Sequence, residues 1–117
     1  MSEPVLRLET EQCKDAWRFA AFLDGRLAAT LEAYPSGEDV HIHNEVRIWS
    51  PEMFRELHYC FLVIRALLKA EGYRLIVTCS DRYTHAMGKY WRLMGFTMFY
   101  TIDNPKGGTI PCAAMEA

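Results

Sequence analysis

The chain has 117 residues, of which 50% are hydrophobic and 24% charged, and its formal net charge at pH 7 is -2. This length supports one folded domain with a core but not two. The composition excludes a disordered chain, and the dispersed Lys and Arg residues exclude an extended nucleic-acid-binding surface. The N-terminus lacks the organisation of a signal peptide, and no apolar run approaches the ~20 residues that cross a bilayer. We therefore expect a soluble, cytoplasmic protein.

Four cysteines, Cys13, Cys60, Cys79 and Cys112, lie far apart in the sequence and form no C-x-x-C pair. Cys60 and Cys79 lie within apolar patterns, where a free cysteine behaves as a small hydrophobic residue. This placement favours buried thiols in a reducing compartment over a disulfide framework or a zinc site.

Before residue 40 the pattern predicts strands at 5–9, 17–23 and 27–34. Asp24-Gly25 separates the second and third of these and predicts a two-residue hairpin turn, because both residues tolerate positive φ. Residues 13–16 offer room for no more than one helical turn. The cluster of Pro, Ser and Gly at 35–39 predicts a loop.

Residues 40–49 alternate between apolar and polar side chains and predict a strand with two different faces. The apolar face comprises Val40, Ile42, Val46 and Ile48. The other face comprises His41, His43, Glu45, Arg47 and Trp49.

A long helix is predicted over residues 51–71. Ser50 can cap it, Pro51 has its φ preset for the first helical position, and Glu52 suits the positive end of the helix dipole. Apolar residues then recur at three- and four-residue steps and predict one buried face, comprising Phe54, Leu57, Phe61, Ile64 and Leu68.

Gly72 ends this pattern, and Leu75–Cys79 is an apolar run of strand length. Thr84 can cap a second helix that stops at Gly95. The inner face of that helix is expected to carry Met87, Tyr90, Trp91 and Met94. A strand is predicted at 97–102, a turn at 104–108 and a short edge strand at 109–115.

The segment from Gly72 to Phe96 resembles the C-terminal half of the GNAT acetyltransferase fold, in which a helix ends in Gly, a strand follows and a short helix closes with a Gly-Phe pair. The resemblance implies an α/β (α+β) fold: a truncated, mixed, largely antiparallel sheet with two main helices and a central parallel pair formed by 40–49 and 75–79. It also implies a single domain over 1–117, comprising N-terminal strands and a hairpin (1–39), a strand-helix-strand-helix core (40–96) and C-terminal strands (97–117). GNAT proteins usually place two helices between their first two strands, and this chain has no room for them.

The same resemblance implies acetyl-CoA as a cofactor, with its pyrophosphate held by the backbone of a glycine-containing loop before the long helix. Here the loop after Trp49 contains no glycine, and Glu52 and Glu56 add negative charge. Acetyl-CoA binding and the absence of any cofactor are therefore equal alternatives. If the cofactor binds, Arg55 is expected to meet a phosphate, and the backbone of Ile48 and Trp49 the pantetheine arm.

Many GNAT enzymes also carry an Asn at the start of the closing helix and a Tyr four residues before its final Gly, which can protonate the departing thiolate. Counting back from Gly95 puts Thr84 at the Asn position and Trp91 at the Tyr position. Because an indole N–H is not a usable acid, this position departs from the family pattern. The neighbouring Tyr90 is expected to serve packing.

The polar face of the strand at 40–49 carries the best catalytic candidates. Glu45 or His43 can act as a general base on an amine, directly or through water. The alternative is a solvated face left open by the missing helices. His41 and His43 form a His-x-His pair, but further zinc ligands at useful spacing are not evident in the sequence.

Two functions of different classes follow. One is an acetyl-CoA-dependent N-acyltransferase with a degenerate cofactor loop. The other is a non-catalytic GNAT-like scaffold for protein contacts or self-association, without nucleic-acid or membrane binding. In overall character the chain is similar to short GNAT-like proteins of tailed bacteriophages, which include acetyltransferases and virion or assembly proteins, so the virion is an alternative to the cytoplasm.

Overall fold

The computed structural model describes residues 6–13, 15–48 and 50–117. In chain order the elements are β1 (Leu6–Cys13), β2 (Ala16–Leu23), β3 (Arg26–Ser36), β4 (Asp39–Val46), α1 (Pro51–Ala70), β5 (Leu75–Cys79), α2 (His85–Met94), β6 (Met98–Asp103) and β7 (Thr109–Glu116). Among the described residues, no helix combines the length and the apolar character that crossing a membrane requires.

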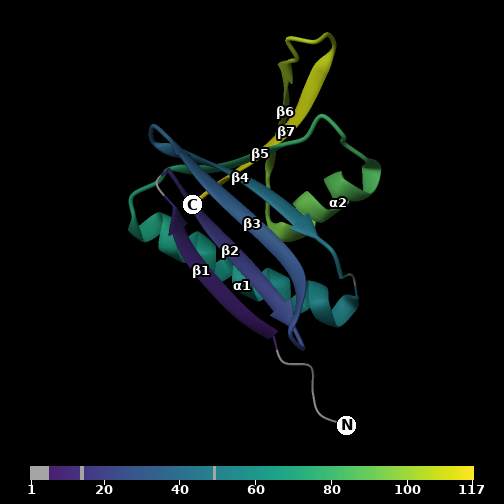
Figure 1. Cartoon of the computed structure of the whole chain (residues 1–117). Helices are drawn as coiled ribbons and strands as arrows, with labels where there is room; N and C mark the ends of the chain where they lie inside the picture. The colour runs from purple at the N-terminus through teal and green to yellow at the C-terminus, as the bar shows by residue number, and fades with distance from the viewer. Residues whose placement is uncertain (1–5, 14, 49) are drawn as a thin grey trace.

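The seven strands form one sheet in the order β1-β2-β3-β4-β5-β7-β6. Neighbouring strands are antiparallel except β4 and β5, which run parallel and are joined through α1. Figure 1 shows this arrangement, with the β6–β7 hairpin extending beyond the rest of the sheet. The predicted fold class, a mixed and largely antiparallel sheet with a central parallel pair and two helices, is confirmed.

The N-terminal strands form consecutive hairpins. The predicted turn between β2 and β3 is confirmed, because Asp24 and Gly25 both have positive φ, 50° and 78°. β1 continues to Cys13 and pairs directly with β2 from Ala16. Residues 13–16 therefore connect two paired strands and leave no room for helices between them.

Two boundaries around β4 differ from the sequence prediction. Residues 35–39 are not a loop, because β3 and β4 stay paired up to Ser36 and Asp39 around a tight turn at Gly37, whose φ is 63°. The strand predicted over 40–49 ends at Val46. Trp49 lies outside the described residues.

The C-terminal strand was predicted at the sheet edge, and this is wrong. β7 lies between β5 and β6, pairing Met115 with Ile76 on one side and Ala114 with Met98 on the other. All six residues of β6 are exposed, and β6 is the edge strand at this end of the sheet, opposite β1. The predicted burial of Cys79 is also wrong, because this residue at the end of β5 is exposed.

Both helices begin at the predicted caps. The Ser50 Oγ accepts a hydrogen bond from the Met53 N–H at 3.0 Å, and the Thr84 Oγ1 accepts one from the Met87 N–H at 3.1 Å. α2 ends at Gly95, whose φ of 110° is unfavourable for residues with a Cβ. These caps determine the residues at which α1 begins and at which α2 begins and ends.

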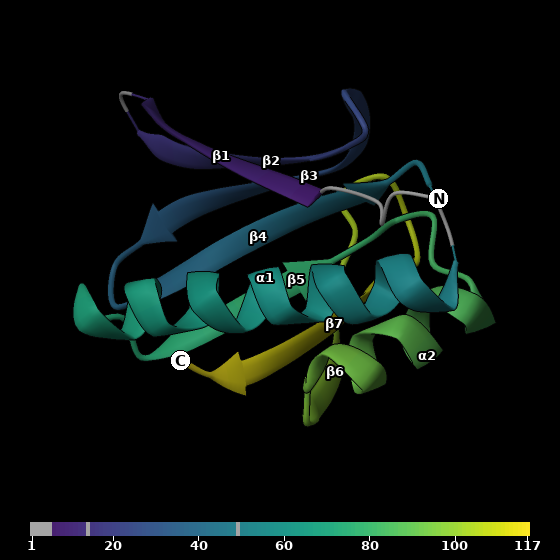
Figure 2. The same cartoon turned by 90° about the horizontal axis from the view of Figure 1, so that it is seen from below.

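α1 and α2 pack against one face of the sheet, which we call the helix-covered face; Figure 2 shows α1 lying along it. The predicted burial of Leu57, Phe61, Ile64 and Leu68 on α1 is confirmed, whereas Phe54 is half-buried. The main core joins both helices to the strands: Phe19, Leu31, Val40, Ile42, Phe61, Ile64, Leu68, Ile76, Trp91, Met94 and Met115. Large side chains of distant segments therefore meet in one cluster.

The opposite face, which we call the open face, carries no helix in the described part of the chain. Strand register places Glu11, Arg18, Glu32 and His43 in one row across β1 to β4. Arg18 Nη2 donates to Glu32 Oε1 at 3.2 Å. The part of the open face that β1 to β4 form is therefore polar along this row, as predicted for His43 and Glu45.

Candidate functional site

β4 and β5 separate part-way along the sheet. Their parallel pairing runs from Asp39 with Leu75 to His41 with Val77, and the Thr78 hydroxyl then donates to the Ile42 carbonyl at 3.2 Å. Beyond this point β4 pairs with β3 and β5 pairs with β7. The divergence leaves an opening in the middle of the sheet.

This opening is a cleft of about 640 Å³, a volume suited to a small-molecule ligand. Its walls are the end of β4, the end of β5, Phe54 of α1 and one side of α2: His43, Asn44, Glu45, Val46, Phe54, Thr78, Cys79, Ser80, Thr84, Ala86, Met87, Lys89, Tyr90, Trp91 and Leu93. Because alternate residues of β4 point to opposite faces, the cleft is lined from both the helix-covered face and the open face. A ligand can therefore meet side chains of both faces at once.

Tyr90 and Asn44 form the helix-covered side of the cleft. Asn44 Nδ2 donates to Tyr90 Oη at 2.7 Å, and the Phe54 ring stands edge-on to the Tyr90 ring with their centroids 5.9 Å apart. Burial raises the pKa of Tyr90 to about 12, although the Asn44 hydrogen bond offsets part of this effect. At neutral pH the phenol is therefore protonated.

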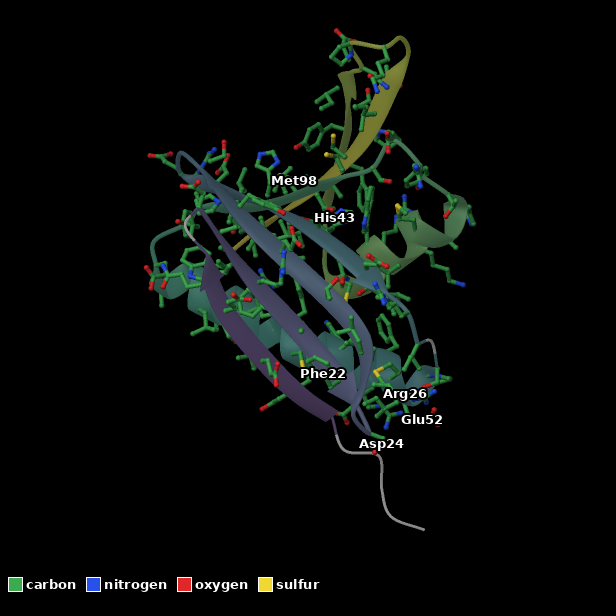
Figure 3. All side chains as sticks on the ribbon, viewed as in Figure 1. Phe22, Asp24, Arg26, His43, Glu52 and Met98 are labelled. Carbon is green, nitrogen blue, oxygen red and sulfur yellow. The ribbon has the colours of Figure 1, made fainter. Side chains whose placement is uncertain are left out.

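His43 and Glu45 form the open side of the cleft. Figure 3 is viewed from the open face and labels His43 on β4. The Glu45 carboxylate pairs with Arg47 Nε at 3.3 Å, and both side chains are more than half exposed, so this pair contributes little to stability. The structure brings the two predicted base candidates into one cleft; their catalytic role stays a prediction.

Arg55 lies in a second, shallow hollow at the start of α1, together with Ser50, Pro51, Phe54 and His58. The His58 ring stacks on the Phe54 ring at a centroid distance of 6.0 Å. Phe54 lines both the hollow and the cleft. The two sites are therefore adjacent, and an extended ligand can reach from one to the other.

The backbone donors at the start of α1 are largely engaged. Pro51 has no N–H, the Met53 N–H donates to Ser50 Oγ at 3.0 Å, and the Phe54 N–H donates to the Ser50 carbonyl at 2.8 Å. Glu52 adds a negative charge in this first turn. An anion here would depend on the Arg55 and His58 side chains more than on the helix backbone.

Three further residues were predicted to contact the cofactor: Ile48, Trp49 and Thr84. Thr84 lines the cleft while capping α2. Ile48 lies in neither site: it packs against a small core cluster, and its N–H donates to the Ala28 carbonyl at 3.3 Å. Trp49 lies outside the described residues, so its predicted role stays a prediction.

Sequence reasoning missed Asn44, His58 and the cleft-facing position of Tyr90. Asn44 occupies the same face of β4 as Val40 and Ile42, and a polar residue at a core-facing position was a usable signal. Counting along the GNAT motif directed attention to Trp91, which is buried in the core at 6% exposure. Tyr90 is therefore the tyrosine of α2 that reaches the cleft.

No protein-family model matches the sequence, and no curated protein shows significant sequence similarity to it. Solved structures match in fold. An aminoglycoside 6'-acetyltransferase type Ii superposes with a TM-score of 0.70 at 16% identity, over 88% of this chain and 70% of that chain. The ribosomal-protein-S18-alanine N-acetyltransferase from Escherichia coli gives a TM-score of 0.63 at 15% identity, over 90% of this chain and 71% of that chain. A GNAT-family acetyltransferase from Streptococcus pneumoniae gives 0.68 at 11%, over 90% and 68%.

The fold of this chain is therefore the GNAT acetyltransferase fold. At identities of 11% to 16% the likeness establishes the arrangement of strands and helices. Because one fold supports many activities, the function has to be argued from the cleft itself.

Proposed function

We propose that this protein is an acyl-CoA-dependent N-acyltransferase, with acetyl-CoA as the simplest donor, and that it binds this cofactor weakly. The cleft carries the proposal, because it joins a protonated, half-buried phenol on one face of the sheet to titratable side chains on the other. The acetyltransferases that share the fold support the choice of reaction.

Acetyl-CoA fits the site in part. The hollow and the cleft adjoin at Phe54, so Arg55 and His58 would hold the pyrophosphate and the cleft would accept the acyl end. A glycine cradle is missing, and the first-turn N–H groups of Met53 and Phe54 already have partners. Side-chain charge replaces backbone donation, and we expect a lower affinity for this reason.

The bound cofactor supplies an acyl group already activated as a thioester. Tyr90 would be the proton donor to the leaving thiolate, and its pKa of about 12 makes it a weaker acid than a free tyrosine, which would limit the rate of this step. Asn44 holds the phenol in place through its hydrogen bond. On the open side, Glu45 or His43 accepts the proton of the attacking amine.

Calorimetric titration with acetyl-CoA tests binding, and chromatographic measurement of released CoA with an amine acceptor tests turnover. We expect a Kd within the range of about 1 μM to 1 mM that is typical of substrates, weakened by Arg55→Ala and unchanged by Lys69→Ala at the other end of α1. Tyr90→Phe should lower kcat without weakening binding, whereas the exposed Tyr59→Phe should leave both unchanged. The absence of heat at millimolar acetyl-CoA would exclude the enzyme.

A non-catalytic scaffold is the second candidate. It is favoured by the start of α1, where Ser50 engages the backbone donors and Glu52 and Glu56 oppose an anion. A protein of this kind would bind no acetyl-CoA and would retain the fold for contacts with another protein, such as a virion or assembly component. The same titration separates the two candidates.

A further inference from the structure

Two cysteines from distant parts of the chain face each other in the sheet. Cys79, the last residue of β5, is the direct cross-strand partner of Cys112 in β7. The neighbouring Ser80 N–H donates to the Pro111 carbonyl at 3.2 Å. This bond places the cysteine pair at a non-hydrogen-bonded position of the antiparallel ladder, where the two Cα atoms approach to about 4.5 Å.

Both side chains point to the open face, because the alternate residue Ala113 belongs to the core on the helix-covered face. The Cys112 Sγ–H donates to the Ile110 carbonyl oxygen at 3.4 Å, and burial, with the neighbouring Cys79 as a further cause, raises the pKa of Cys112. Cys79 is exposed, whereas Cys112 is 3% exposed. One thiol is therefore accessible to a reagent, and the other is held directly behind it.

We infer that Cys79 and Cys112 form a thiol modification site that closes to a reversible cross-strand disulfide, with a low-molecular-weight disulfide such as oxidised glutathione as the co-reactant. A Cα separation of about 4.5 Å lies within the window of about 4.4–6.8 Å that disulfides require. The register of β5 and β7 already supplies the alignment, so no backbone rearrangement is needed. Cys79 also lines the cleft, which puts this site at its edge.

The reaction proceeds by two exchange steps. The Cys79 thiolate attacks one sulfur of oxidised glutathione, forming a mixed disulfide and releasing one glutathione thiolate. The Cys112 thiolate then attacks Cys79 Sγ, forming the internal disulfide and releasing the second glutathione. The two protein thiols are oxidised, the glutathione disulfide is reduced to two glutathione molecules, and the two thiol protons pass to the released thiolates. Burial is the main cause that raises the pKa of Cys112, and it remains after Cys79 has formed the mixed disulfide, so the second step is expected to be faster at alkaline pH.

The experiment treats the full, reduced chain with excess oxidised glutathione, quenches it by alkylation, and measures the intact mass and the disulfide-linked peptides. Compared with the untreated protein, we expect the alkylated product to carry two fewer alkyl groups and to have lost two hydrogen atoms, with one linked pair, Cys79 and Cys112. Cys112→Ser should accumulate a glutathione adduct at Cys79, and the matched control Cys60→Ser should behave like the wild type. A stable glutathione adduct at Cys79 of the wild-type protein, an internal bond that maps to another cysteine, or an unreactive Cys79 would overturn the inference.

A second measurement needs no variant. Phenylarsine oxide joins two adjacent thiols through one arsenic atom and releases one water molecule. Wild-type protein should bind one equivalent, and prior oxidation by glutathione disulfide should abolish this binding. Binding that persists after oxidation, or no binding to the reduced protein, would also refute the proposed pair. Neither readout depends on acetyl-CoA, so the outcome is separate from that of the proposed function.

Discussion

The two faces of the sheet are built differently. The helix-covered face is filled by large side chains that are almost fully buried, such as Phe61, Leu68 and Ile76. The open face carries the polar row that includes Arg18, Glu32 and His43 on β1 to β4, and then the small residues Val77, Cys112 and Ala114 on β5 and β7. The free energy of unfolding should therefore depend mainly on the helix-covered face.

The cleft is where the two faces meet. There the same strand, β4, presents Asn44 to one face and Glu45 to the other. Substitutions on the open side of the cleft should change chemistry with little change in folding, whereas substitutions on the helix-covered side should affect both. The following predictions test this separation, beginning with the largest expected effect.

Glu45→Gln and His43→Ala test the open side of the cleft. If the protein transfers acyl groups, loss of the general base should lower kcat by about 10²–10⁴, while the free energy of unfolding changes by no more than about 0.5 kcal/mol because both side chains are exposed. The steady-state rate and urea unfolding of each variant provide the measurement. Full activity in both variants would show that neither side chain is the base.

Leu68→Ala tests the helix-covered face. Leu68 is 2% exposed, and removing a large aliphatic side chain from a packed core should cost about 2–5 kcal/mol of unfolding free energy. Leu67→Ala, one position along the same helix and 51% exposed, is the matched control and should cost well under half as much. Equal losses in urea denaturation would mean that α1 buries a different face.

Tyr90 predicts how stability changes at alkaline pH. An unfolded tyrosine titrates near pH 10, whereas burial keeps the Tyr90 proton in place to about pH 12. Between these values the folded state binds more protons than the unfolded state, so stability falls as pH rises. The loss for two pKa units is about 2–3 kcal/mol. Between pH 8 and about pH 12 the wild type should lose this amount of unfolding free energy relative to Tyr90→Phe; parallel curves would contradict the raised pKa of this phenol.

The Arg18–Glu32 ion pair predicts the smallest effect. Its side chains are 53% and 28% exposed and their atoms are 3.2 Å apart. A double-mutant cycle with Arg18→Ala and Glu32→Ala should give a coupling of about 0.2–1 kcal/mol that decreases with added salt. A coupling that is large and independent of salt would show that the open face is less solvated than its exposure indicates.

The local parts of the fold were predictable from the sequence. Ser50, Thr84 and Gly95 fix the helix ends through short-range caps, and Leu68 follows helical periodicity, so each could be identified within a few residues. The position of β7 could not be predicted in this way. Its insertion between β5 and β6 depends on pairing Ile76 with Met115, a contact that no local pattern encodes.

The candidate site also has parts that local sequence patterns predict and parts that they do not. Alternation along β4 correctly put His43 and Glu45 on one polar face, because strand periodicity is a local property. The contact of Asn44 with Tyr90 joins residues that are 46 positions apart, and it depends on how α2 packs beside the separated strands. Motif counting put Trp91 at the catalytic position, and the neighbouring Tyr90 was therefore assigned to packing.

The position of β7 between β5 and β6 also has a consequence for synthesis on the ribosome. When residues up to Asp103 have emerged, β5 still lacks one of its two neighbours, and Ile76 has not yet met Met115. The apolar sides of α1 and β5 must therefore wait, partly exposed, until residues 109–116 have been translated. Because chain elongation adds only about 5–20 residues per second, a nascent chain of this sequence passes through an interval in which chaperone binding and premature association compete with folding.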